Sequence, residues 1–306
     1  MNTAIRVTGL RKRYGELEAV RGIDFEVAEG ECFALLGPNG AGKTTTVEIL
    51  EGYRDRDAGD VEVLGLDPRR GGRDLRERIG IVLQSSGHFR ELTVREVLEL
   101  FGGYYPRPRA TGEVIDLVGL GEKAGARVKT LSGGQQRRLD LALGLVGDPD
   151  LLFLDEPTTG FDPSARRRSW ELIESLRELG KTILLTTHYM DEAQNLADRV
   201  AIIAAGRIVA TGTPDSLGGR DEGEAQIGFR LPAGTALADL PADLPGRPAS
   251  HEGRVQLRTT EPTRALHVLT AWALARGEEL DGLTVTRPSL EDVYLQLTSD
   301  QEPIHA

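Results

Sequence analysis

The chain has 306 residues, of which 39% are apolar and 28% charged, and its formal net charge at pH 7 is −11. This length suffices for one large domain and a smaller one. The negative charge argues against non-specific binding to DNA or RNA, which requires a positive surface. No apolar run approaches the ~20 residues of a membrane-spanning helix, and residues 1–6 lack the apolar stretch of a signal peptide. The one cysteine, Cys32, fits a reducing cytosol and is expected to be a buried structural thiol.

Strand-like runs and helical patterns alternate along the first two thirds of the chain. The early runs alternate apolar and polar residues, as half-exposed antiparallel strands do, and the later runs are uniformly apolar, as strands buried on both faces are. The order predicts an α/β fold around a largely parallel sheet. The predicted strands are 5–7, 23–27, 32–36, 61–63, 79–83, 151–154, 182–185 and 200–204, and the predicted helices are 44–50, 94–101, 113–118, 135–146, 164–179 and 190–196.

The composition changes near residue 215, where a polar, glycine-rich linker begins. We therefore predict a first domain of residues 1–215 and a small α+β domain of residues 216–306. In the second, Leu266, Leu269 and Ala273 recur at helical spacing and predict a stripe that faces the core. Its expected elements are strands 226–231, 254–258 and 283–286, helix 263–276 and a proline-rich loop with Pro232, Pro241, Pro245 and Pro248.

Residues 37–45 fit the pattern Gly-x4-Gly-Lys-[Ser/Thr] between a predicted strand and a predicted helix, which is the context of a phosphate-binding loop. Glycines let backbone N–H groups approach an anion, and the helix directs its positive N-terminus at the same place. Lys43 would contact the terminal phosphates, and the Thr44 hydroxyl could ligate Mg²⁺. The predicted nucleotide-binding residues here are Gly37, Pro38, Asn39, Gly40, Ala41, Gly42, Lys43, Thr44 and Thr45.

A second candidate feature is the pair of acids that ends the apolar run 151–154. Ligands bind at the carboxyl ends of strands in open α/β sheets. Asp155 is therefore expected to hold Mg²⁺, directly or through water, and Glu156 to polarise the attacking water. Two acids after a strand are common by chance, and the signal gains its strength from the phosphate-binding loop.

The segment Leu131-Ser132-Gly133-Gly134-Gln135 precedes a predicted helix. By its chemistry alone it is either a further anion-binding loop or an ordinary helix cap. It matches, letter for letter, the signature of the ATP-binding-cassette (ABC) ATPases, and the chain resembles that family in order over about residues 5–212. The resemblance implies a P-loop ABC ATPase core with a mixed sheet and a helical subdomain at about 86–146, which hydrolyses ATP with Mg²⁺.

The resemblance also implies roles for four scattered residues. Tyr14 stands where the family has an aromatic that stacks on adenine, and Gln84 where it has a glutamine that contacts Mg²⁺ and water. Asp162 matches an acidic loop that communicates between subunits, and His188 matches the histidine that contacts the γ-phosphate. Taken singly, each has an ordinary alternative: a surface aromatic, a strand cap or a core histidine. Phe161 departs from the leucine that the family usually has.

The chain contains one phosphate-binding loop and one signature segment. In the family these two segments lie too far apart within one subunit to share a nucleotide. The resemblance therefore implies a head-to-tail homodimer, in which each ATP is held by the phosphate-binding loop of one copy and by residues 131–135 of the other. A reciprocal two-fold interface of this kind suits a homodimer.

Residues 288–298 resemble the tail of ATP-binding subunits of ABC-2 type exporters, the group typified by daunorubicin resistance. Packing alone could also explain this segment, because Ser289 can cap a short helix with apolar residues at helical spacing. The resemblance implies a peripheral subunit at the cytoplasmic face of the membrane that powers export, such as antibiotic export, through a separate transmembrane permease. The alternatives are an importer subunit and a soluble ABC ATPase with a non-membrane partner. The transported substrate stays open.

Overall fold

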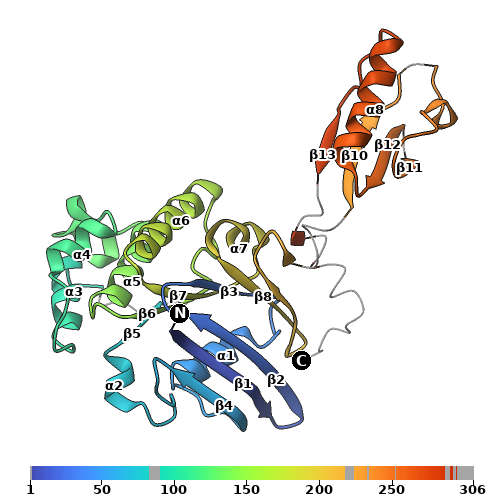
Figure 1. Cartoon of the computed structure of the whole chain (residues 1–306). Helices are drawn as coiled ribbons and strands as arrows, with labels where there is room; N and C mark the ends of the chain where they lie inside the picture. Colours follow the sequence, from blue (N-terminus) through green and yellow to red (C-terminus); the bar gives the residue numbers. More distant parts are fainter. Residues whose placement is uncertain are drawn as a thin grey trace. The chain divides into compact units, whose positions relative to one another are not determined.

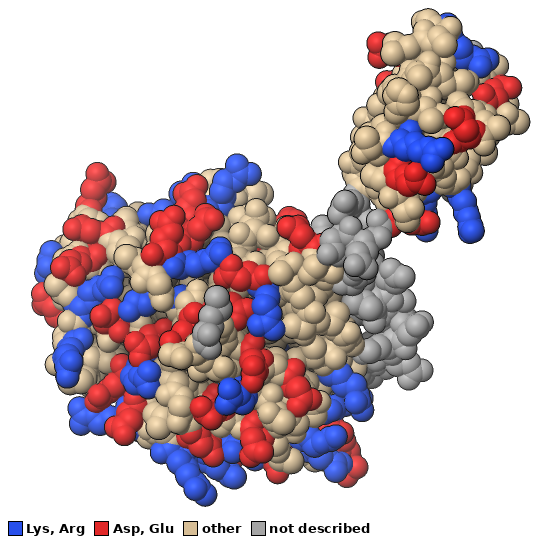
Figure 2. Space-filling view, viewed as in Figure 1, with Lys and Arg blue, Asp and Glu red and all other residues tan. Residues whose placement is uncertain are grey.

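The computed structural model describes residues 2–82, 90–217, 224–232, 234–251, 253–286, 290–291 and 294. The chain divides into two compact units, one that runs to Pro214 and one that begins at Asp215 (Figure 1). Among the described residues, no helix combines the length and the hydropathy needed to cross a membrane. On the face of the first unit seen in Figure 2, acidic and basic side chains are interspersed. That face therefore offers no extended basic surface for nucleic acid.

The first unit begins with a three-stranded antiparallel sheet in the order β2-β1-β4. Its strands alternate buried and exposed residues, as predicted; they are β1 (Thr3–Tyr14), β2 (Leu17–Ala28) and β4 (Ala58–Val63). β1 continues well past the predicted residue 7, although its last residues are polar. The reason is the hairpin with β2, in which Tyr14 pairs with Leu17 across a turn where Gly15 has a φ of 59°. Backbone pairing thus extends a strand that has no apolar pattern of its own.

A six-stranded sheet forms the centre of this unit, in the order β5-β6-β7-β3-β8-β9. Every residue of β3, β6 and β7 is buried, which agrees with the uniformly apolar runs in the sequence. β9 pairs antiparallel with β8 across a turn with positive φ at Ala205 and Gly206, and no strand was predicted there. The strands are β3 (Cys32–Leu36), β5 (Ile79–Val82), β6 (Leu151–Asp155), β7 (Thr182–Thr187), β8 (Arg199–Ala204) and β9 (Arg207–Gly212).

Helices cover both faces of the six-stranded sheet. α1 contacts strands of both sheets and contributes Val47, Ile49 and Leu50 to the core between them, whereas α6 and α7 pack together on the opposite face (Figure 1). α3, α4 and α5 pack against one another. The helices are α1 (Lys43–Leu50), α2 (Gly72–Arg76), α3 (Val94–Gly102), α4 (Thr111–Leu117), α5 (Gly133–Leu145), α6 (Pro163–Glu178) and α7 (Met190–Leu196), with 3-10 turns at Gly121–Lys123 and Val128–Thr130.

The second unit is an antiparallel sheet in the order β11-β12-β10-β13 with one helix packed on it. Leu269 and Ala273 of that helix are buried and Leu266 packs against the same core, which confirms the predicted stripe. The elements are β10 (Ala225–Arg230), a 3-10 turn (Leu237–Asp239), β11 (Arg247–His251), β12 (Arg254–Thr259), α8 (Pro262–Ala275) and β13 (Thr284–Thr286).

One expectation for this unit was wrong. Pro248 was placed in a loop, but it lies within β11 and pairs with Leu257 of β12. β11 is at the edge of the described sheet, and no described strand lies on its outer side, so a residue there needs no N–H for strand pairing on that side. Proline is tolerated at such an edge. Of the residues 288–298 that resemble exporter tails, most lie outside the described residues, but Leu290 is described and is buried.

Burial changes the protonation of two ionisable groups in the first unit, Cys32 and Glu51. Cys32 is a free, buried thiol, as expected. Burial chiefly raises its pKa, to about 12, so it is not reactive. Glu51 follows α1 directly and is 9% exposed. Burial, and then the nearby charges of Asp155 and Glu48, raise the pKa of Glu51 to about 8.

Glu51 should make the stability of the protein depend on pH. Its folded pKa lies above its unfolded value, so its contribution is fully present below the unfolded pKa and is lost as pH rises through about 8. We expect Glu51→Gln to raise the melting temperature at pH 9 by roughly 5–10 °C, the equivalent of ~3 kcal/mol in the free energy of unfolding. At pH 5 the melting temperature should stay nearly unchanged. Thermal unfolding followed by circular dichroism at both pH values measures this. Exposed Glu16→Gln is the control, and an equal shift at both pH values would contradict the assignment.

Candidate nucleotide-binding and hydrolysis site

The loop between β3 and α1 packs closely against neighbouring strands because two of its positions are glycines, which have no Cβ atom. A Cβ atom on Gly37 would lie 2.2 Å from the carbonyl oxygen of Ile203, and one on Gly42 would lie 2.5 Å from that of Ala19. Gly42, which has a φ of 103°, is also the N-cap of α1. The loop is thus held close to β8 and β2, and the N-terminus of α1 faces the space above it.

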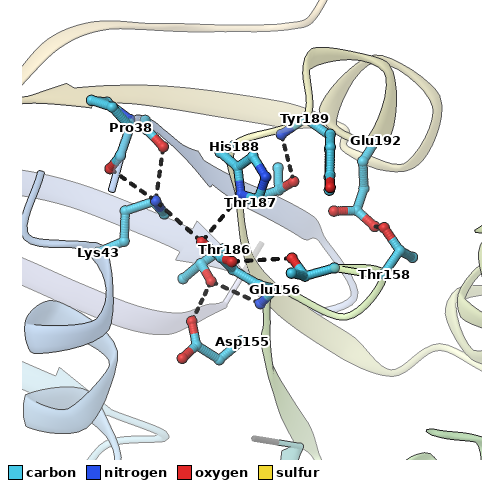
Figure 3. A network of polar contacts seen from close by, with 12 residues as sticks. Pro38, Lys43, Asp155, Glu156, Thr158, Thr186, Thr187, His188, Tyr189 and Glu192 are labelled. Atoms are coloured by element: carbon cyan, nitrogen blue, oxygen red, sulfur yellow. Dashed lines mark hydrogen bonds and ion pairs between the residues drawn. The ribbon is translucent and has the colours of Figure 1, made fainter. Parts of the chain in front are cut away.

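Lys43 is buried beneath this loop and is only 4% exposed. Its Nζ donates hydrogen bonds to the carbonyl oxygens of Gly37 at 2.8 Å and Pro38 at 3.1 Å, and it lies 3.5 Å from Oε1 of Glu156 (Figure 3). Burial lowers the pKa of Lys43, and the charge of Glu156 opposes that shift. The cation is therefore fixed in position by the two carbonyls and paired with one carboxylate.

An open pocket of about 400 Å³ lies above the loop and brings together residues from distant parts of the sequence. Tyr14 at the end of β1 forms one part of its lining and is 39% exposed. The guanidinium of Arg54 lies 5.2 Å from the Tyr14 ring centroid, within cation–π range. The lining residues are Tyr14, Leu17, Ala19, Asn39, Gly40, Gly42, Lys43, Thr44, Thr45 and Glu156, most of which the sequence predicted.

Asp155 and Glu156 emerge at the carboxyl end of β6, where β7 runs parallel with Asp155 opposite Thr186. The Thr186 hydroxyl donates to Oδ1 of Asp155 at 2.5 Å. The backbone N–H of Glu156 donates to both the carbonyl and the hydroxyl oxygen of Thr186 at 3.1 Å. Glu156 has a φ of 45°, which is rare for a residue with a side chain. The two bonds to Thr186 hold it in that conformation and direct its carboxylate toward Lys43.

The Glu156 carboxylate has several close partners. Its Oε2 accepts a hydrogen bond from the Thr159 hydroxyl at 3.1 Å, and its Oε1 lies 3.3 Å from Nδ1 of His188 (Figure 3). Burial raises the pKa of Glu156, but Lys43, Thr159 and His188 lower it by more, so that it lies below the usual value for glutamate. The group is therefore a carboxylate at neutral pH, the protonation state that a general base requires.

Known proteins resemble this chain over its whole length. A family model described as ABC transporter matches residues 20–159, and one described as ABC transporter domain-containing protein-like, C-terminal domain, matches residues 225–289. Daunorubicin resistance ATP-binding protein DrrA3 of Streptomyces coeruleorubidus is 40% identical over 99% of this chain and 98% of its own. The chain belongs to the ABC transporter ATP-binding proteins. It is an ABC ATPase, and it is a nucleotide-binding subunit.

Two further proteins agree with this assignment. Nod factor export ATP-binding protein I of Paraburkholderia xenovorans (strain LB400) is 43% identical to this ABC ATPase over 96% of the chain and 97% of its own. The solved structure of cbiO1 from Clostridium perfringens, described as part of the ABC transporter complex cbiONQ, is 29% identical with a TM-score of 0.64. It covers 71% of this chain and 90% of its own. The predicted fold class and family are thus confirmed, whereas the roles of single residues stay predictions.

The signature segment of this ABC ATPase begins α5. Ser132 is its N-cap: its hydroxyl accepts from the N–H of Gln135 at 3.4 Å, and the Gln135 side chain accepts from the N–H of Ser132 at 2.9 Å. Among the described residues that line the pocket, none belongs to residues 131–135. One copy therefore supplies the phosphate-binding loop and Glu156 to the pocket, but not the signature segment.

Asp162, a further predicted residue, does not line the pocket. Asp162 is the N-cap of α6 and accepts hydrogen bonds from the N–H groups of Ser164 and Ala165, both at 2.9 Å. These bonds, led by that from Ala165, lower the pKa of Asp162. Capping is a structural role, and the predicted communication between subunits stays a prediction. Gln84 lies outside the described residues.

Sequence reasoning missed two residues that organise this site. Arg137 on α5 is 7% exposed and donates to the carbonyl oxygens of Pro157 at 3.0 Å and Asp155 at 3.3 Å, which ties α5 to the end of β6. Thr186 holds Asp155 through its carboxylate and Glu156 through its backbone N–H. The only sequence signal for Thr186 was its position at the end of an apolar strand just before His188. Arg137 had none, because the groups through which it holds the end of β6 are backbone carbonyls.

Proposed function

We propose that this ABC ATPase powers export through a separate membrane-spanning permease, which holds it at the cytoplasmic face of the membrane. The observation that carries the proposal is likeness over the full chain to two relatives whose names state drug resistance and export, including the second unit. A likeness confined to the first unit would support ATP binding alone. Antibiotics are one class of substrate that this function admits, and the permease would make the contacts that select the compound.

The pocket suits a magnesium nucleotide. Tyr14 offers an exposed ring on which adenine can stack, and Lys43 with the N-terminus of α1 offers donors for the phosphates. Thr44 and Asp155 supply the hydroxyl and carboxylate oxygens that Mg²⁺ prefers. The described residues contain no cluster of three His, Cys, Asp or Glu side chains able to hold a metal ion. This fits an ion that takes most of its remaining ligands from phosphate and water.

Glu156 is the proposed general base, with His188 and Gln84 as its predicted neighbours at the reacting phosphate. In the structure Glu156 is paired with Lys43. A phosphate oxygen that takes Lys43 as its partner would remove the largest of the influences that lower the Glu156 pKa. Burial would then raise that pKa, and a more basic carboxylate is a better proton acceptor for the attacking water. Substrate binding would thus prepare the base for its task.

A second copy is proposed to complete the site. The pocket of one copy lacks residues 131–135, while Ser132 and Gly133 are exposed at the start of α5. A helix N-terminus with exposed glycines is suited to phosphate. In a head-to-tail homodimer, each pocket would gain this segment from its partner, and ATP would lie between the two.

Purification from the native membrane tests the transport function. The tagged protein should be recovered with the detergent-extracted membrane fraction together with a polytopic membrane protein, and the ATPase rate of that complex should respond to the transported compound. A Lys43→Ala protein is the control, since it should assemble normally but lose the ATPase response. Recovery only in the soluble fraction with a non-membrane partner would contradict export. Uptake rather than extrusion by reconstituted vesicles would favour an importer.

A further inference from the structure

A carboxyl group that the proposed mechanism does not use is buried behind the catalytic residues. Glu192 of α7 is 0% exposed. Its Oε1 accepts hydrogen bonds from the Thr158 hydroxyl at 2.8 Å and from Nε1 of Trp170 at 3.3 Å (Figure 3 shows Thr158). Burial raises its pKa, and side-chain hydrogen bonds from Thr187, Thr158 and Trp170 oppose the shift. An apolar side chain would fill this space without the cost of burying a carboxyl group.

Glu192 and its two hydrogen-bond partners, Thr158 and Trp170, come from three elements that surround the reacting centre. Thr158 follows Glu156 by two residues, and the neighbouring Thr159 holds the Glu156 carboxylate. Trp170 belongs to α6, whose N-cap is Asp162. Glu192 itself lies on α7, directly after the His188 segment. The Glu192 carboxyl group therefore joins three parts of the site. They are the loop that carries Glu156, helix α6 with its N-cap Asp162, and helix α7, which follows His188.

A second contact joins α6 to the same segment. The Arg166 guanidinium lies 4.1 Å from the centroid of the Tyr189 ring, and that ring lies 4.1 Å from the His188 ring. Arg166 and Trp170 are four residues apart and so lie on one face of α6. The N–H of Arg166 donates to the carbonyl oxygen of Asp162 at 2.9 Å, within the first turn of the helix. A movement of the Asp162 loop would thus reach His188 through one rigid helix and two side-chain contacts.

We propose that Glu192 is a positioning residue that couples the Asp162 end of α6 to His188. Through Thr158 and Trp170 it sets the position of His188 against Glu156, so that the arrival of a second copy at the Asp162 loop adjusts the hydrolytic residues. The inference rests on the proposed function for the role of the second copy. It assigns Glu192 no contact with the nucleotide, so the residue should affect turnover more than nucleotide affinity.

Tryptophan fluorescence offers a direct test, since the chain has only two tryptophans. A Trp272→Phe parent leaves Trp170 as the sole reporter, and its emission should change when ATP binds. In this parent we expect Glu192→Leu to lower kcat at least tenfold, to abolish the Trp170 response and to keep the dissociation constant for ATP within about threefold. Glu174→Gln, an exposed change on the same helix, is the matched control and should preserve all three values.

Thr158→Val removes the hydroxyl that donates to Glu192 and keeps the side-chain volume nearly constant. It is the alternative variant if Glu192→Leu does not fold. It should lower kcat several-fold and weaken the Trp170 response at unchanged ATP affinity. A folded Thr158→Val or Glu192→Leu protein that keeps kcat and the Trp170 response within twofold of the parent would overturn the proposal. A parent that also carries Glu156→Gln and stays monomeric at saturating ATP would instead overturn the proposed role of the second copy, so the two failures are distinguishable.

Discussion

Replacing Glu156 by glutamine is expected to slow ATP hydrolysis by about 10²–10⁴-fold, which is the usual contribution of a positioned general base. The amide keeps the size of the side chain and can still accept from Thr159, but it cannot take a proton from water. Release of phosphate under saturating ATP measures the effect. The matched control is Glu178→Gln, an exposed change at the end of α6. Hydrolysis by Glu156→Gln near the wild-type rate would remove Glu156 from the role of base.

The same variant tests the proposed dimer, because it should hold ATP without consuming it. At saturating ATP and Mg²⁺, Glu156→Gln protein is expected to sediment as a dimer, and the wild type should return to its starting state as hydrolysis proceeds. Ser132→Arg at the start of α5 should prevent dimer formation while ATP still binds to the pocket. A Glu156→Gln protein that stays monomeric under these conditions would contradict the idea that two copies share each nucleotide.

Replacing Lys43 by alanine is expected to weaken ATP binding by about 10- to 150-fold, the equivalent of one charge-assisted contact of ~1.5–3 kcal/mol. Hydrolysis should be lost as well, since the same cation would stabilise charge on the transferred phosphate. The change also leaves the carbonyl groups of Gly37 and Pro38 without their buried donor and Glu156 without its cation.

Binding of fluorescent ATP, measured in a Glu156→Gln background to prevent turnover, gives the affinity directly. Lys123→Ala, an exposed change distant in sequence from the loop, is the control. Thermal unfolding of Lys43→Ala separates loss of a ligand contact from loss of the folded loop. Unchanged affinity in a folded Lys43→Ala protein would show that the pocket above α1 does not hold the phosphates.

The phosphate-binding loop illustrates a part of the site that could be predicted from sequence. Its chemistry is local: glycine spacing, a lysine and a following helix are adjacent residues, and their geometry follows from backbone sterics. The uniformly apolar strands were equally readable, because a strand buried on both faces leaves no polar positions. β9 and the end of β1 were not readable, since both depend on pairing with a neighbouring strand rather than on their own pattern.

Contacts between distant residues were beyond sequence reasoning. Glu156 and His188 were both predicted as catalytic, but not the 3.3 Å approach between them or the pairing of Glu156 with Lys43. The roles of Thr186, Arg137 and Glu192 arise only when β6 and β7 align and α5, α6 and α7 pack around them. A threonine, an arginine and a glutamate have no distinctive meaning until their partners are known.

The amino-acid sequence by itself determined that this protein binds nucleotide phosphates in an α/β fold, because those properties reside in short runs of adjacent residues. The tertiary structure decided which side chains share the pocket, how the base is paired, and that residues 131–135 of one copy lie outside its own pocket. The physical reason is that hydrogen bonds and ion pairs act over only a few ångströms. Which residues come within that range depends on the register of the strands and the packing of the helices, not on their separation along the chain.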